Sequence, residues 1–274
     1  MGNKAGKTAV KIITIVTFLG MVAVNALANI LPLNGVNTGQ VSEAYPNLFA
    51  PAALTFAIWG LIYLLLAGFT LYQLGLFQGY KYAVKTELLH MIGIIFSISS
   101  LANAAWIFAW HYNLILLSML LMIVILVCLI AINRIINKEM LTLREKIFIR
   151  LPFSVYFGWI TVAAIANATV LLVIWGWNGF GIAEAVWAII IIIVGMLIGA
   201  ATTIRNRDAA YGLVLVWAYS GILIKHTSAG GFAGRYPEII AAVVVCIILL
   251  LAAVIYSYFA RPRGKPLHHN GRIK

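Results

Sequence analysis

Residues 101–132 have the sequence LANAAWIFAWHYNLILLSMLLMIVILVCLIAI. Apolar residues fill this stretch on both sides of a short polar break formed by His111, Tyr112 and Asn113. The two apolar runs, 88–110 and 113–132, each have the roughly 20 residues that a helix needs to cross a bilayer. Because so few residues connect them, the sequence predicts a tight hairpin of two membrane-spanning helices.

The whole chain has the composition of a membrane protein. Of its 274 residues, 64% are hydrophobic and only 9% are charged, whereas soluble domains average about 25% charged residues. The sequence therefore predicts an all-α, polytopic helical bundle with eight spans. These spans are expected at 10–31, 54–75, 88–110, 113–132, 151–175, 183–203, 210–226 and 237–260.

The basic residues predict the orientation of these spans. In an eight-span arrangement 17 of the 19 Lys and Arg residues fall on one side of the membrane. The two exceptions are Lys225 and Arg235. Cytoplasmic loops are enriched in Lys and Arg, so both termini are expected in the cytoplasm, and no transit peptide is evident. A bacterial plasma membrane is the expected location. The net charge of +12 is explained by topology, and no nucleic-acid partner is expected.

The first apolar run has an alternative interpretation. Lysines, an apolar stretch and Ala26-Leu27-Ala28 together resemble a secretory signal peptide with its cleavage site. Cleavage would leave seven spans. The run continues apolar through Leu31 and Leu33, which favours a first membrane span.

Polar and aromatic side chains recur at helical spacing in four spans. Such spacing places them on one face of each helix, and all of them are expected at a similar depth, below the connection 32–53. The faces are Asn25 and Asn29 in the first span; Phe56, Trp59 and Tyr63 in the second; Phe96, Ser99, Asn103, Trp106 and Trp110 in the third; and Tyr156, Trp159 or Ile160, Ala163 and Asn167 in the fifth.

Two interpretations of these residues stay open. A single tryptophan near a membrane boundary is usually an interfacial residue, which is the expectation for Trp110, Trp175 and Trp177. A single asparagine usually joins helices by hydrogen bonds. Their joint occurrence on several spans favours a shared cavity with aromatic and amide walls, which is the usual composition of a small-molecule site.

Three stretches resemble the TspO/MBR family, the translocator or tryptophan-rich sensory proteins. They are PNLFAPAALTFAIWGLIYLLL (46–66), the hairpin quoted above, and RLPFSVYFGWITVAAIANATVLLVIW (150–175). The resemblance implies a five-helix core with a ligand pocket below the first connection, and an apolar planar ligand such as a porphyrin or another tetrapyrrole, or a sterol. The matching pocket positions are Trp59, Tyr63, Asn103, Trp106, Trp159 and Asn167.

The resemblance covers residues 1–178, and the chain continues beyond it. We expect a TspO-like core over 1–178, a three-helix membrane segment over 179–260 and a basic cytoplasmic tail over 261–274. The last three spans have three alternative roles: a permeation path, an oligomer face such as that of a homodimer, or a scaffold. Glu184 and Lys225 are expected either to form an ion pair or to remain separate with Lys225 reaching the interface. Asp208 is expected in a solvated turn.

The sequence bears on three classes of function. A ligand-binding or sensory membrane protein agrees with the aromatic and amide faces, and its partners would be membrane lipids and an apolar small molecule. A transporter or permease component is the alternative. An enzyme is not expected, because the chain has no H-E-x-x-H or G-x-S-x-G motif; turnover of a bound pigment is the exception that the resemblance leaves. No cofactor is required, although a bound tetrapyrrole fits the resemblance.

Overall fold

The computed structural model describes residues 4–31, 33–78 and 85–259. Within these ranges eight helices are long and apolar enough to cross a membrane, and no strand is found. The eight-span, all-α prediction is therefore confirmed. The expected basic tail, 261–274, lies outside the described residues. The helices are α1 (Lys4–Ile30), α3 (Ile58–Leu74), α4 (Thr86–His111), α5 (Ile115–Ile136), α7 (Leu151–Ile174), α8 (Glu184–Asn206), α9 (Ala209–Thr227) and α10 (Pro237–Phe259).

Short elements fill the connections between these helices. Between α1 and α3 lie a 3₁₀ turn (Leu33–Gly35), the six-residue helix α2 (Thr38–Glu43) and a second 3₁₀ helix (Ala53–Ala57) that continues into α3. Asn37 and Gln40 form a reciprocal capping box at the start of α2. We call residues 33–57 the lid segment.

The connection between α5 and α7 is partly helical. Helix α6 (Leu143–Glu145) and a π-helical turn (Lys146–Arg150) lead directly into α7. The capping box of Thr142 and Glu145 starts this helical run. Pro152 follows within the first two positions of α7; because proline has no N–H, the wide turn ahead of it loses a backbone donor.

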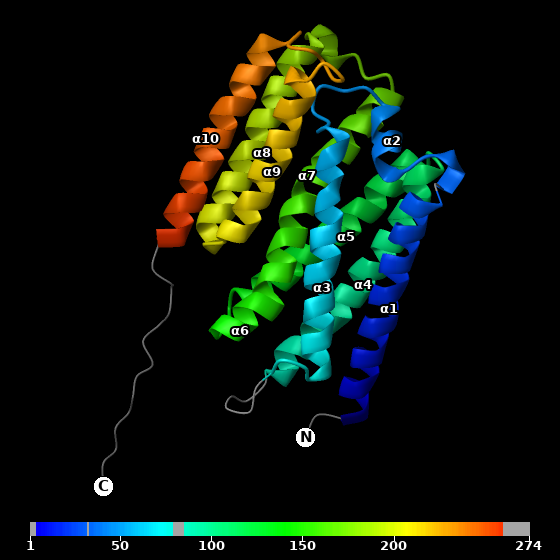
Figure 1. Ribbon diagram of the computed structural model, residues 1–274, viewed down its shortest axis with the longest axis vertical. Coiled ribbons are helices and arrows are strands. Elements are labelled where there is room, and N and C mark those ends of the chain that lie inside the picture. The colour runs from blue at the N-terminus through cyan, green and yellow to red at the C-terminus, as the bar shows by residue number, and fades with distance from the viewer. Residues whose placement is uncertain (1–3, 32, 79–84, 260–274) are drawn as a thin grey trace.

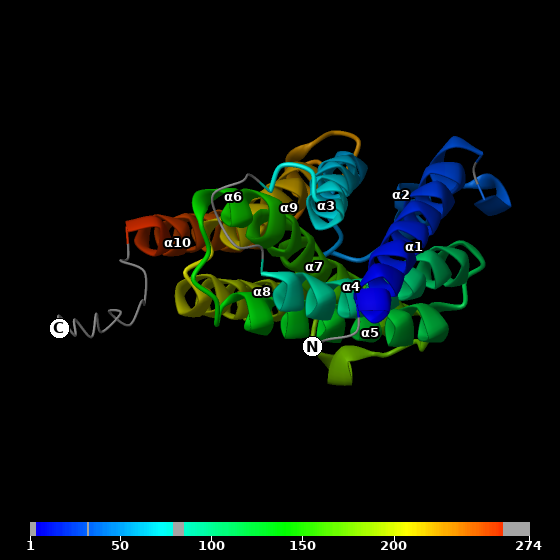
Figure 2. The same ribbon diagram turned by 90° about the horizontal axis from the view of Figure 1, so that it is seen from below.

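Helix α7 lies in the middle of the molecule. It packs against α3 and α5 on one side and against α9 and α8 on the other, so that α1, α4 and α5 form one flank and α8, α9 and α10 the other (Figure 2). Helix α1 begins and α10 ends toward the lower end of the bundle, whereas α2 lies at the upper end (Figure 1). We call the lower end, which carries Lys7, Lys85 and Arg144, the basic end, and the upper end the lid end.

Two glycines allow α9 to pack closely against α7 and α8. A Cβ atom on Gly158 of α7 would lie 2.9 Å from the backbone oxygen of Tyr211, and one on Gly199 of α8 would lie 1.9 Å from Leu215 Cδ2. Small residues at helix interfaces allow this close packing in membrane proteins. Helix α9 therefore approaches the backbone of α7 closely, and α8 in turn packs closely on α9.

Asp208, at the turn between α8 and α9, is buried. The expectation of a solvated turn is wrong, because only 4% of this residue is exposed. Its carboxylate accepts hydrogen bonds from the Ser154 hydroxyl at 2.5 Å and from the Tyr211 backbone N–H at 3.1 Å, and Arg150 Nε lies 3.9 Å away. Asp208 thus caps α9 and ties it to the start of α7.

Candidate functional site

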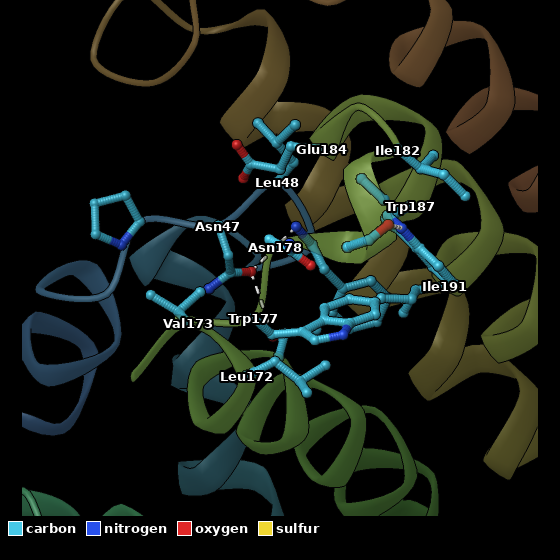
Figure 3. Close-up of a pocket in the computed structure, with 15 residues that line it drawn as sticks. Asn47, Leu48, Leu172, Val173, Trp177, Asn178, Ile182, Glu184, Trp187 and Ile191 are labelled. Atoms are coloured by element: carbon cyan, nitrogen blue, oxygen red, sulfur yellow. Dashed lines mark hydrogen bonds between the residues drawn. The ribbon is translucent and has the colours of Figure 1, made fainter. Parts of the chain in front are cut away.

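Two cavities lie at the lid end of the bundle. The first, which we call the aromatic cavity, has a volume of about 30 Å³. The second, the α7–α8 pocket, has a volume of about 430 Å³ and is drawn in Figure 3. The two share no lining residue. The aromatic cavity is lined by Ser42, Pro51, Phe56, Trp59, Trp106, Trp110, Trp159, Val162, Ala163, Ala166 and Asn167.

The aromatic cavity occupies the position that the sequence predicts, below the lid segment. Trp59 comes from α3, Trp106 from α4, and Trp159 and Asn167 from α7. The helical spacing of these residues explains their convergence, because each helix turns one face toward the same space. The cavity is small, because a volume of about 30 Å³ leaves room for only a few water molecules.

Ring contacts hold the aromatic walls in place. The indole rings of Trp106 and Trp110 stack with centroids 5.5 Å apart. Trp159 contacts Trp59 and Phe56 edge to face, with centroid distances of 6.3 Å and 5.6 Å. Each such pair contributes about 0.5–1.5 kcal/mol beyond the burial of its area. The walls are therefore rigid aromatic surfaces rather than mobile side chains.

Two of the predicted site residues do not line the aromatic cavity. Tyr63 stacks on the ring of Trp59, with ring centroids 5.5 Å apart, and is not itself a lining residue. Asn103 is fully buried; its amide accepts a hydrogen bond from Asn25 at 2.8 Å and donates one to the Tyr156 hydroxyl at 3.1 Å. In this structure Asn103 joins α1, α4 and α7, which is the alternative that the sequence left open for single asparagines.

Asn167 lines the cavity and also joins helices. Its side-chain oxygen accepts a hydrogen bond from Trp106 Nε1 at 3.0 Å, and its nitrogen donates to Ser118 Oγ at 3.0 Å. These bonds fix the Trp106 ring and connect α4, α5 and α7. A direct role of Asn167 toward a ligand remains a prediction, since its amide already has partners within the protein.

Trp159 differs from the other cavity residues. Only 2% of it is exposed, and its Nε1 atom is buried without a hydrogen-bond partner among the described residues. Burying such a donor unpaired costs about 1–3 kcal/mol. The cavity lining therefore includes a tryptophan whose buried indole N–H has unused hydrogen-bonding capacity, together with other aromatic and apolar residues and the polar residues Ser42 and Asn167.

Trp110 is part of the cavity and not of an interfacial belt. It is 4% exposed, and its Nε1 atom donates to the backbone oxygen of Thr38 in α2 at 3.2 Å. The interfacial expectation for Trp110 is therefore wrong. Trp175, by contrast, is 63% exposed, as expected of a residue facing the membrane boundary.

The lid segment is fastened to α4 by a buried histidine, His111, which lies in the polar break of the helical hairpin. The Nδ1 atom of His111 lies 3.1 Å from the backbone oxygen of Leu33, and its Nε2 atom lies 3.1 Å from Thr38 Oγ1. A carbonyl oxygen can only accept, so Nδ1 donates to Leu33, and Nε2 forms a hydrogen bond with the threonine hydroxyl. One imidazole thus holds both ends of the lid's first turn.

Helix α9 fastens the other end of the lid segment. His226 Nε2 lies 2.9 Å from the backbone oxygen of Leu48, and Trp217 Nε1 donates to the backbone oxygen of Thr55 at 3.0 Å. The backbone N–H of Ala52 donates to the oxygen of Gly221 at 3.0 Å. The lid therefore bridges α4 and α9 across the top of the cavity.

Lys225 also contacts the lid, which settles one expectation. Its ammonium group lies 3.3 Å from the carboxylate of Glu43 in α2. The expected pair with Glu184 is therefore wrong, because α9 faces the lid and not the start of α8 at this level. A sequence signal was present in the neighbouring Lys225 and His226 at the end of an apolar span, but it did not identify their partners.

The fold and the cavity define a polytopic helical membrane protein with a small lid-covered aromatic cavity. A family model described as TSPO-like protein matches residues 11–256, so the chain belongs to the TSPO-like family. The match runs from α1 into α10, which means that α8, α9 and α10 lie within the matched region. No curated protein and no solved structure matches the chain significantly.

Proposed function

We propose that this protein is a membrane-embedded binding protein for an apolar, planar ligand of the porphyrin or sterol type. The observation that carries the proposal is the buried Nε1 of Trp159, which has no partner among the described residues, in a side chain that lines a cavity together with other aromatic rings. An apolar ring system would stack on these walls. An acceptor on the ligand, such as a carbonyl, a carboxylate or a pyrrole nitrogen, would satisfy the indole donor.

Binding of a planar ligand is coupled in this proposal to displacement of the lid segment. The cavity volume of about 30 Å³ is far below the several hundred Å³ of usual ligand pockets. The lid is held by two hydrogen bonds from His111 and by one each from Trp110, His226 and Trp217, and each contributes only about 0.5–1.5 kcal/mol net. The Ala52–Gly221 backbone hydrogen bond and the Lys225–Glu43 ion pair also hold it. Loss of a few of these bonds would open the roof of the cavity without unfolding the bundle.

The test is a titration of the purified protein with protoporphyrin IX, in which quenching of tryptophan fluorescence reports binding. Trp159→Phe keeps a ring in the wall but removes the donor, so we expect binding about three- to tenfold weaker. Trp175→Phe is the matched control, because Trp175 is largely exposed and does not line the cavity. Absence of saturable quenching in folded protein, or equal weakening in both variants, would contradict the proposal.

Ion-coupled transport, the alternative function, receives less support. All seven Asp and Glu residues of the chain are described, and they lie at helix ends or in connections. Transporters that couple to protons or cations commonly carry carboxylates within their spans. The proposal also assigns no catalytic step. It puts the protein in a bacterial plasma membrane with the basic end in the cytoplasm, in agreement with the charge bias.

A further inference from the structure

The α7–α8 pocket is a second concave site, separate from the aromatic cavity. The lid segment contributes residues 46–49 to the pocket, and the other walls come from the end of α7, the connection to α8 and the first turns of α8. Figure 3 shows Trp177, Trp187 and Glu184 arranged around this cavity together with Asn47 and Leu48. Its volume of about 430 Å³ lies within the range of small-molecule pockets.

Two tryptophans form an aromatic corner of the pocket. The rings of Trp177 and Trp187 have centroids 4.9 Å apart and planes inclined by 60°. Trp187 Nε1 donates to the backbone oxygen of Gly179 at 2.8 Å, which fixes that ring. A Cβ atom on Gly179 would lie 2.8 Å from the Trp187 ring, and its φ of +61° is one that side chains rarely adopt. The corner is therefore built around a glycine, and Trp177, which lies in the α7–α8 connection and is partly buried, contributes to it.

Among the described residues, Glu184 supplies the only charge in the lining, and no Lys, Arg or His lines the pocket. Glu184 is exposed at the first position of α8, and no described residue forms a hydrogen bond or ion pair with its carboxylate. Lys225, the partner that the sequence suggests, pairs with Glu43 instead.

The side-chain oxygens of the two asparagines in the lining are engaged within the protein. The side-chain oxygen of Asn47 accepts from the backbone N–H groups of Phe49 and Ala50 at 3.1 Å and 2.8 Å. The side-chain oxygen of Asn178 accepts from the backbone N–H of Phe180. The lining therefore combines two tryptophan rings, one carboxylate and apolar residues such as Leu172, Ile182 and Ile191.

We propose that the α7–α8 pocket binds an organic cation, an ammonium group carried on an apolar body. The ring quadrupoles of tryptophan attract a cation, the carboxylate of Glu184 complements its charge, and the aliphatic walls cover its body. A bare metal ion would need several oxygen ligands, and the pocket supplies one carboxylate. The proposal rests on different lining residues from the function proposed for the aromatic cavity, although the lid segment contributes to both sites.

The ammonium group could belong to a soluble amine or to a choline lipid headgroup. The structure favours the soluble amine, because a headgroup would also bring its phosphate next to a pocket that has no cationic lining residue. Both sources share the same recognition chemistry, and the experiment below separates them.

The test measures binding of benzyltrimethylammonium to the full-length protein in nonionic detergent by isothermal titration calorimetry. Its neutral carbon analogue, neopentylbenzene, has the same shape without the charge. We expect saturable binding of the cation and at least severalfold weaker binding of the analogue. Equal binding of the two, or no saturable binding of the cation to folded protein, would overturn the proposal.

Two sets of variants locate the bound cation. Glu184→Gln should weaken binding of benzyltrimethylammonium roughly fivefold. Glu238→Gln, which removes the same charge from the first turn of α10 at the same end of the bundle, should leave it unchanged. Trp177→Phe should bind almost as well as the native protein, whereas Trp177→Leu should bind roughly five- to tenfold more weakly. Equal effects of the two glutamate variants would overturn the proposal.

The same titration in lipid nanodiscs identifies the source of the cation. If phosphatidylcholine nanodiscs abolish probe binding and phosphatidylglycerol nanodiscs do not, the pocket takes a choline headgroup. If binding persists in both, the pocket takes a soluble amine. Both results support an organic-cation site, and loss of binding in both lipids despite folded protein would overturn it.

Discussion

The side chain of Asn103 connects three helices through a single amide group. It accepts a hydrogen bond from Asn25 of α1 and donates one to Tyr156 of α7. In the low-polarity interior of a membrane bundle, an amide left without partners is costly. The same face of α4 carries Trp106 and Trp110, which line the aromatic cavity. The bonds of Asn103 therefore set the position of this wall relative to α1 and α7.

At the residue scale, Asn103→Ala should lower the stability of the protein by about 1–2 kcal/mol, because Tyr156 and Asn25 lose a common partner. Thermal or denaturant unfolding in detergent measures this change. The control is Asn29→Ala, whose amide donates only to the backbone of its own helix and is exposed; its effect should stay within about 0.5 kcal/mol. Similar losses in both variants would argue against a connecting role for Asn103.

The lid segment and helix α9 pack closely enough to exclude a single methyl group. A Cβ atom on Gly221 would lie 2.0 Å from Thr55 Oγ1 and 3.0 Å from Pro51 Cβ. The oxygen of Gly221 also accepts from the Ala52 N–H. The roof of the cavity therefore depends on α9, a helix outside residues 1–178, over which the sequence predicts the five-helix core, but inside the region that the TSPO-like family model matches.

At the element scale, Gly221→Ala should loosen the lid and lower stability by about 1–3 kcal/mol, since overpacking forces neighbouring atoms to shift. Faster chymotrypsin cleavage within residues 33–57, together with a lower melting temperature in detergent, would show it. Gly20→Ala in α1 serves as the control, because its Cβ would meet nothing within 4 Å and alanine favours helix. The prediction fails if lid cleavage is unchanged in Gly221→Ala.

The charge distribution of the whole molecule separates its two ends. Lys7, Lys85 and Arg144 lie at the basic end, where Lys7 pairs with Glu87 and Lys85 pairs with Glu139 at 2.8 Å. The lid end carries Lys225, which pairs with Glu43. Exposed Leu and Ile side chains cover the helices between the ends, as expected of a surface that contacts lipid hydrocarbon.

At the scale of the whole molecule, we expect the basic end in the cytoplasm. A cysteine at position 229 (Ala229→Cys, in the α9–α10 connection) should react with a membrane-impermeant maleimide in intact cells. One at position 138 (Lys138→Cys, after α5) should react only after permeabilisation. Both positions are exposed, and the native Cys128 and Cys246 are buried, which keeps the background low. The reverse pattern would invert the proposed topology.

Hydropathy and helical spacing were sufficient to predict the eight spans and the place of the aromatic cavity. An apolar run of about 20 residues has few alternatives to a spanning helix, and side chains three and four positions apart must share a face. Trp59, Trp106, Trp159 and Asn167 therefore converge as expected. The same spacing could not distinguish a lining residue from a connecting one, because Asn103 and Trp106 lie on one face and differ only in their partners on other helices.

By itself, the sequence determined the class of protein, the number of spans, the bias of charge toward one end and the family to which the chain belongs. Only the tertiary structure decided the partners: Lys225 with Glu43, His226 with Leu48, Asp208 with Ser154, and Trp177 with Trp187. The physical reason is that hydrophobicity and period are properties of one helix. Partner choice, and with it the α7–α8 pocket, depends on which helices lie side by side after packing.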